Sequence, residues 1–193
     1  FGFFWCVILV AAPVTAVFAE GKFAAVDRPA RTPIQELVDA AGTGDTTTVR
    51  RLLDAGAMVS AGLPDTGVQA LHQAAANGHV GLVGLLLERG AQVDATDVDG
   101  ASALVYAAYH GRTKVIEVLL AAGAKVELLP KRQVHALNAA ILSGSIDTVK
   151  TLVEAGADPD RQDVFGKSAR EYAAQVARSD LAALFDASKE RAR

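Results

Sequence analysis

Residues 71–93 read LHQAAANGHVGLVGLLLERGAQV and contain the two patterns that decide the fold. The first part, up to Gly78, is a short run of helix-forming residues rich in alanine, which lets neighbouring helices approach closely. From His79 onward the apolar residues follow helical spacing, which predicts a second helix ending at Gly90. The stretch is therefore expected to be a helical hairpin, with glycine at the positions where a helix end needs a positive φ.

The hairpin pattern recurs along the chain in steps of 34, 33 and 33 residues. Gly-Ala pairs start at positions 56, 90, 123 and 156. The glycines that divide each hairpin stand at 44, 78, 111 and 144, and apolar pairs start at 52, 86, 119 and 152. Three markers in one phase predict stacked repeats, because a single hairpin cannot bury both of its apolar faces. Asp-rich turns, such as 91–100, are expected to join one hairpin to the next.

The composition excludes several classes of function. The chain has 193 residues and a net charge of −3, which argues against a basic nucleic-acid-binding surface. Cys6 is the one cysteine, so the rest of the chain has no disulfide framework, cysteine-ligated zinc site or cysteine nucleophile. No two histidines coincide at the repeat offset, and no catalytic or phosphate-loop motif is present. We therefore expect no enzyme activity, no cofactor and no metal site.

The first 19 residues, FGFFWCVILVAAPVTAVFA, carry no charge and precede Glu20. The small residues at the end of this segment predict a signal peptide that is cleaved after Ala19. The alternative is an uncleaved membrane anchor, because about 20 apolar residues suffice to span a bilayer. Both interpretations place the residues after Ala19 outside the cytoplasm. A cleaved segment makes the protein periplasmic or secreted, and an uncleaved segment tethers it to a membrane. Residues 20–31 are expected to be a linker.

The repeats resemble those of the ankyrin-repeat family, with units of the form G-x-T-P-L-H-x-A-A-x-x-G-H, an apolar helix and L-L-x-x-G-A-x-V. The second unit matches at Gly67, Leu71, His72, Ala74-Ala75, Gly78-His79, Leu86-Leu87, Gly90-Ala91 and Val93. The Thr-Pro pair is absent from the inner units, where Gln69-Ala70, Ser102-Ala103 and His135-Ala136 stand instead. The resemblance implies an all-α solenoid of about five helix–turn–helix units, two of them caps, with extended turn fingers.

The resemblance also implies where the solenoid ends and which residues are structural. The repeat domain is expected to cover residues 32–186, and residues 187–193 are expected to be a solvated tail. In the last unit Arg170 replaces a buried leucine, which suits a terminal repeat with a polar outer face. His72 and His79 occupy the family's histidine positions, where the imidazole ties loops to the backbone.

The function that the resemblance implies is non-catalytic binding of a protein in a concave groove. Among small exported ankyrin-repeat proteins of bacteria, that role can be the support of another envelope protein; the alternative is a membrane-anchored scaffold. We expect a monomer with no nucleic-acid partner, and contact with a membrane only if the N-terminal segment remains uncleaved. By position, the residues expected to line the groove are Asp65, Thr66, Val68, Asn77, Val98, Asp99, Ala101, Tyr109, His110, Lys131, Arg132, Val134, Leu142, Ser143, Phe165 and Lys167, with Ala76 and Val164 beside them.

Two features of this surface leave alternatives open. Tyr109 and Phe165 are the expected aromatic anchors, although Phe165 could instead pack against the cap. Charge along the turns alternates from acidic at 94–99 to basic at 131–132 and acidic again at 158–163. This banding could set the register of a partner, or it could serve solubility alone. The Asp-rich turns lack the spacing of a calcium-binding EF-hand loop, so solvated turns are favoured over weak calcium sites.

Overall fold

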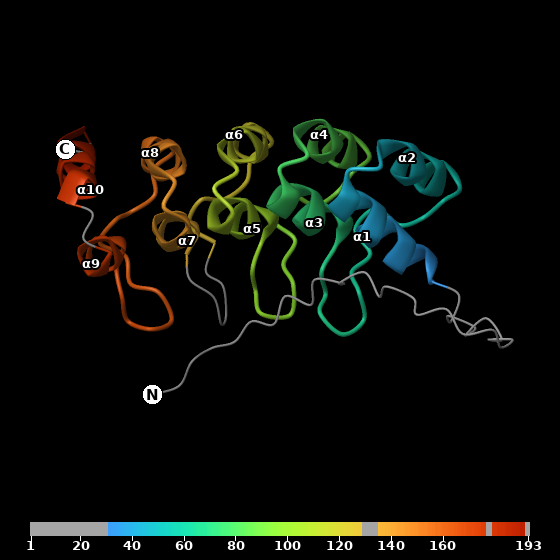
Figure 1. Cartoon of the computed structure of the whole chain (residues 1–193), viewed down its shortest axis with the longest axis horizontal. Coiled ribbons are helices and arrows are strands. Elements are labelled where there is room, and N and C mark those ends of the chain that lie inside the picture. The colour runs from blue at the N-terminus through green and yellow to red at the C-terminus, as the bar shows by residue number, and fades with distance from the viewer. Residues whose placement is uncertain (1–30, 129–134, 177–178, 192–193) are drawn as a thin grey trace, which may run out of the picture. The chain divides into compact units, whose positions relative to one another are not determined.

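The computed structural model describes residues 31–128, 135–176 and 179–191. The expected signal peptide and residues 20–30 of the expected linker lie outside the described residues. The described residues form ten helices, paired in five hairpins (Figure 1). The helices are α1 (Pro33–Thr43), α2 (Thr46–Asp54), α3 (Ala70–Asn77), α4 (Val80–Glu88), α5 (Ala103–Tyr109), α6 (Thr113–Ala121), α7 (Ala136–Ser143), α8 (Ile146–Glu154), α9 (Ala169–Gln175) and α10 (Ser179–Arg191).

The hairpins stack so that their helices form two layers, as expected for a solenoid. The first helices α1, α3, α5, α7 and α9 contact one another in order, and α4, α6, α8 and α10 do the same in the second layer (Figure 1). Fully buried alanines, among them Ala74, Ala107 and Ala140, fill the first layer. Larger side chains such as Leu86 and Ile116 fill the second. One continuous apolar core therefore runs through all five hairpins.

Glycine inside a hairpin turn serves both backbone conformation and close packing. Gly44 and Gly78 end α1 and α3 with φ values of 76° and 81°. A side chain at Gly44 would lie 2.7 Å from the ring of His79, and one at Gly78 would lie 3.1 Å from Arg112. Both larger side chains belong to the following hairpin, so these glycines leave the space through which one repeat reaches the next.

Histidines tie neighbouring segments together, and the structural roles expected of His72 and His79 are confirmed. The Nδ1 atom of His72 accepts a hydrogen bond from the Gln69 N–H at 3.0 Å, so its Nε2–H donates to the Ala95 carbonyl at 3.1 Å. His79 Nε2 donates to the Gly42 carbonyl, 3.1 Å away in the preceding hairpin. His135 makes a similar bond to the Gln162 carbonyl at 3.0 Å, which the sequence had not suggested.

Extended turns project from the first-helix layer between successive hairpins, and we call them fingers (Figure 1). The second finger comprises residues 60–69, the third 92–102 and the fifth 158–168, each named for the hairpin that follows it. Isolated β-bridges join Gly62 to Gln69 and Thr96 to Ser102 at two of the finger bases. The N–H of Val98 also donates to the Thr66 carbonyl at 3.0 Å, so adjacent fingers are hydrogen-bonded to each other.

The last hairpin has the polar outer face that a terminal repeat needs. Arg170 forms ion pairs with Asp160 at 2.6 Å and with Asp186 at 2.8 Å, and its guanidinium lies over the Phe185 ring. Burial by itself would lower the pKa of Arg170, but the hydrogen bonds that its guanidinium donates to these two carboxylates outweigh burial and raise it. Helix α10 continues to Arg191, so the tail expected from residue 187 begins inside a helix. The Ser-Lys-Glu-Arg sequence there contains good helix formers, which accounts for the extension.

Two glycines inside α4 provide a direct test of helix energetics. An added Cβ at Gly81 or Gly84 would meet no atom within 4 Å. We expect Gly81→Ala combined with Gly84→Ala to raise the free energy of unfolding by about 1 kcal/mol per site, because alanine loses less backbone entropy in a helix. Thermal unfolding followed by circular dichroism measures the effect.

The matched control is Gly90→Ala, which also meets open space but at a φ of 88°. We expect this variant to lose stability, because an alanine is strained in the left-handed region. A loss of stability in the Gly81/Gly84 double variant would show that the two glycines serve a close contact instead.

Candidate partner-binding surface

The third finger is fixed by one carboxylate at its base. Asp97 Oδ1 accepts hydrogen bonds from the N–H groups of Asp99 at 3.0 Å and Ala101 at 2.8 Å. Its Oδ2 accepts from the Tyr106 hydroxyl at 2.8 Å. Tyr106 lies on α5, so these bonds attach the fingertip to the helix beneath it. We call this pair of residues an Asp–Tyr clamp.

A second Asp–Tyr clamp, Asp163 with Tyr172, fixes the fifth finger. Asp163 accepts from the N–H groups of Phe165 at 2.9 Å and Lys167 at 3.1 Å. It also accepts from Asn138 Nδ2 at 3.2 Å and from the Tyr172 hydroxyl at 2.9 Å. Burial by itself would raise the pKa of Asp163, but the hydrogen bonds outweigh burial and lower it. Burial, together with the bond to Asp163, raises the pKa of Tyr172 to about 12.

Large apolar side chains are exposed on the fingers and at the ends of the first helices. The exposed fractions are 58% for Val98, 49% for Val164 and 59% for Phe165 on the third and fifth fingers. They are 56% for Tyr109 on α5 and 46% for Leu142 on α7. The exposure of Phe165 supports a surface anchor rather than packing against the cap. These residues follow the expected positions and form the apolar part of the candidate surface.

The polar residues expected on this surface are also accessible. Asp65, Thr66, Asn77, His110 and Ser143 are exposed, and Asp99 and Lys167 are half-buried. The rings of His110 and Tyr109 meet edge to face, with centroids 5.4 Å apart. Burial, and the charge of Arg112, lower the pKa of His110. Lys131, Arg132 and Val134 lie outside the described residues.

Three residues expected to line the surface are in fact buried. Val68 and Ala101 are 9% and 2% exposed, and Ala76 is 7% exposed. Val68 and Ala101 occupy equivalent positions just before α3 and α5, where the finger has already returned to the core. Ala76 lies against the following hairpin, and its carbonyl accepts from Arg112 Nε at 2.9 Å. The expectation that these side chains line the groove is wrong.

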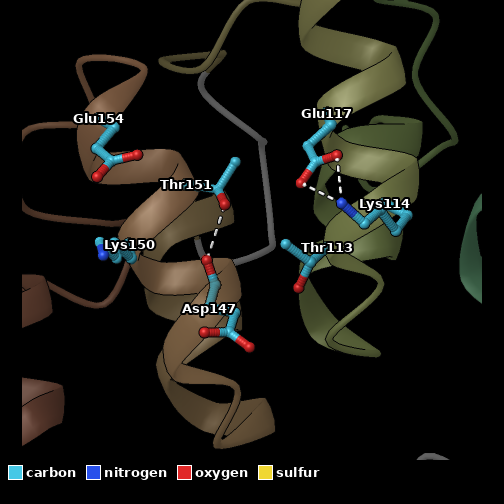
Figure 2. Close-up of a pocket in the computed structure, with 7 residues that line it drawn as sticks. All are labelled: Thr113, Lys114, Glu117, Asp147, Lys150, Thr151 and Glu154. Atoms are coloured by element: carbon cyan, nitrogen blue, oxygen red, sulfur yellow. Dashed lines mark hydrogen bonds and ion pairs between the residues drawn. The ribbon is translucent and has the colours of Figure 1, made fainter.

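A polar groove lies in the other layer, between α6 and α8 (Figure 2). Its volume is about 350 Å³, and its lining is entirely hydroxyl-bearing or charged. Lys114 pairs with Glu117 at 3.0 Å, and the Thr151 hydroxyl donates to the Asp147 carbonyl at 2.8 Å, as Figure 2 shows. Small-molecule sites are mostly apolar, so this groove has the character of a solvated surface. The lining residues are Thr113, Lys114, Glu117, Asp147, Lys150, Thr151 and Glu154.

Comparison with known families agrees with this geometry. A sequence profile for ankyrin repeats, with three copies of the repeat, matches residues 37–129 and again residues 94–163. The chain belongs to the ankyrin-repeat family. Among curated proteins, no sequence matches it closely enough to count as a relative.

Ankyrin repeats are modules for protein–protein interaction, and the family is generally non-catalytic. Within the described ranges, no group of three or more histidine, cysteine, aspartate or glutamate side chains could hold a metal ion. Over the same ranges, no helix has the length and apolar character needed to cross a membrane. The exposed finger and first-helix residues are therefore the candidate functional surface.

Sequence reasoning missed two parts of this surface. Val176, at the end of α9, is 42% exposed and occupies the position that His110 and Ser143 hold in the two preceding hairpins. The two Asp–Tyr clamps were also missed, although Asp97 and Asp163 each precede a tyrosine by nine residues. That recurrence is visible in the sequence only when each repeat is compared with the second repeat after it, not with its immediate neighbour.

The lowered pKa of Asp163 predicts acid sensitivity of the last repeat. A folded-state pKa below the ordinary value of 3.8 stabilises the protein at neutral pH. This contribution is lost as the pH falls through 3.8 and then through the folded-state pKa. We expect Asp163→Asn to cost about 1–3 kcal/mol at pH 7 and less near pH 3, because the lost bonds involve a charged acceptor.

Urea unfolding of wild type and variant at both pH values measures the difference in unfolding free energy. The control is Asp65→Asn, which changes an exposed fingertip carboxylate and should have little effect at either pH. A loss from Asp163→Asn that is equal at both pH values would show that the Asp163 charge does not stabilise the fold.

Proposed function

We propose that the chain is an exported, non-catalytic binding module that holds a protein partner against its fingers and first helices. The observation that carries this proposal is the group of exposed apolar residues Val98, Tyr109, Leu142, Val164 and Phe165 on that side. Tyrosine is among the residue types that provide most of the binding energy at protein interfaces, and the apolar side chains around such an anchor exclude water from it.

The distribution of charge favours the same side. Helices α3, α5 and α7 contain no aspartate, glutamate, lysine or arginine. The outer helices α6 and α8 expose charged residues, including Lys114, Glu117 and Lys150. Covering the uncharged first helices desolvates fewer ions than covering the outer layer, and the cores of interfaces are depleted in charge.

Export and the monomeric state rest on other features. The uncharged segment 1–19 supports a cleaved signal peptide and a periplasmic or secreted location, with support of another envelope protein as the role. The end hairpins carry ion pairs, Arg51–Glu36 and Arg170–Asp186, which oppose stacking of a second copy onto either end. The same N-terminal segment favours a second candidate, a scaffold tethered to a membrane by an uncleaved helix.

Site-specific cross-linking tests the binding surface. A photo-reactive phenylalanine analogue replaces Tyr109 in one variant and Ile146 in the control. Ile146 is 48% exposed but begins the outer helix α8. In cells, we expect a discrete cross-linked product from position 109 and none from position 146. Equal products from the two positions, or a product only from 146, would contradict the proposed surface.

Mass spectrometry of the mature amino terminus separates the two candidates. A protein that begins at Glu20 supports export with cleavage. A retained N-terminal segment, with the protein in the membrane fraction, would instead support the tethered scaffold.

A further inference from the structure

Asn77 and Gly78 lie where α3 ends in the second hairpin, and this pair has a chemistry that partner binding does not use. The backbone N atom of a glycine can attack the side-chain carbonyl carbon of a preceding asparagine, because glycine has no Cβ to obstruct the approach. The chain has two asparagines, and only Asn77 precedes a glycine, since Ala139 follows Asn138. Asn77 is exposed to solvent, whereas Asn138 is 1% exposed.

The reaction replaces the side-chain amide of asparagine by a carboxylate. A bond forms between Gly78 N and Asn77 Cγ, and the bond between Cγ and Nδ2 breaks. The Gly78 nitrogen loses its proton, Nδ2 leaves as ammonia, and a cyclic imide remains. Water then opens the imide at either of its carbonyl carbons, which gives aspartate or isoaspartate. Both products add one negative charge to the chain.

In the folded hairpin, the nucleophile and the leaving group are both hydrogen-bonded elsewhere. Asn77 is the last residue of α3, and Gly78 follows it with a φ of 81°. The Gly78 N–H donates to the Ala75 carbonyl at 3.2 Å, and Asn77 Nδ2 donates to the Gln73 carbonyl at 3.0 Å. The imide can therefore form only when the last turn of α3 opens.

A side chain of the third hairpin holds this turn closed. Arg112 Nε donates to the Ala76 carbonyl at 2.9 Å. The Cδ atom of Arg112 also lies 3.1 Å from the point that a Cβ on Gly78 would occupy, so the arginine packs directly on the turn. Helix ends are among the segments that open locally without unfolding of the whole protein. The contact with Arg112 therefore opposes the opening that the reaction requires.

The two products have different consequences for the fold. A negative charge at the end of a helix is unfavourable, but Arg112 is bonded to the preceding residue and offsets part of this cost. The aspartate product should therefore keep the hairpin folded. Isoaspartate adds a carbon to the backbone, which is incompatible with the left-handed helix end at Gly78. Either product places a charge beside helices that contain no charged residue.

We propose that Asn77 is a deamidation site of the folded protein and that opening of the last turn of α3 limits its rate. Arg112 is the positioning residue that controls this opening. Water is the co-reactant, and the chemistry is that of the chain itself. The modification changes the charge of the candidate surface with time, and it occurs whether or not a partner binds.

Mass spectrometry of the full chain, digested after incubation in mildly alkaline buffer, measures the conversion at position 77. We expect the folded chain to react at least about tenfold more slowly than the chain unfolded in urea, because it must first open. Arg112→Ala should react about fivefold faster than wild type when folded, the factor expected for one lost hydrogen bond. In urea, the two rates should be equal. Asn138 should remain unconverted in the folded chain, because it is buried.

Hydrogen exchange of the Gly78 N–H provides a second measurement of the same opening. We expect Arg112→Ala to accelerate this exchange by the same factor as the deamidation, and to leave exchange at Leu152 in the fourth hairpin unchanged. The matched control is Arg51→Ala, which removes an exposed arginine that pairs with Glu36 in the first hairpin. Exposed ion pairs contribute little to stability, so both rates should stay as in wild type.

Three results would overturn the proposal. The first is no conversion at position 77 in the folded chain while the unfolded chain reacts. The second is an equal rate in the folded and unfolded chains, or an unchanged rate in Arg112→Ala, since the turn would then not limit the reaction. The third is an equal acceleration of exchange at Gly78 and Leu152, which would show that global unfolding, and not opening of α3, exposes the site.

Discussion

Close approach of the first helices is the constraint on which the rest of the structure depends. Ala74, Ala107 and Ala140, one per inner hairpin, are all fully buried where α3, α5 and α7 contact their neighbours. A side chain larger than alanine would push adjacent helices apart or force strained rotamers, at a typical cost of about 1–3 kcal/mol. Separation of the first helices would also break the hydrogen bonds between hairpins, because each of those bonds reaches from one hairpin to the next. The alanines therefore determine the geometry of the fingers as well as the core.

Bonds between hairpins couple repeats that would not be stable alone. His79 reaches the Gly42 carbonyl, and Arg112 reaches the Ala76 carbonyl, each one hairpin back. On the other side of the stack, the N–H of Lys125 donates to Asp94 and that of Asp158 donates to Glu127. Each bond contributes on the order of 1 kcal/mol. Because the contacts join only neighbouring hairpins, the stability of the stack grows with each added interface.

The periodic features of the fold could be predicted from the sequence, whereas the side-chain network of the surface could not. The helix pairs follow from glycine spacing, because Gly44 and Gly78 have the left-handed conformation that their positions implied. Exposure of the fingertips followed from turn composition, but the burial of Val68 and Ala101 did not. A turn residue is buried or exposed according to where the finger returns to the core, and that point depends on the neighbouring hairpin. The Asp–Tyr clamps join residues of two elements, so single-repeat patterns did not reveal them.

The clamps also explain how loops can form a specific surface on a solenoid. A free loop must lose conformational entropy when a partner binds, about 1–2 kcal/mol for each residue that becomes ordered. In the third and fifth fingers, that cost is met during folding, because Asp97 and Asp163 bond the tip backbone to Tyr106 and Tyr172. The low pKa of Asp163 shows that the charged carboxylate stabilises its finger, so its hydrogen bonds outweigh the cost of burial. The carboxylate that orders the fifth finger is itself buried, so it acts on the surface only by fixing the backbone that carries Val164 and Phe165.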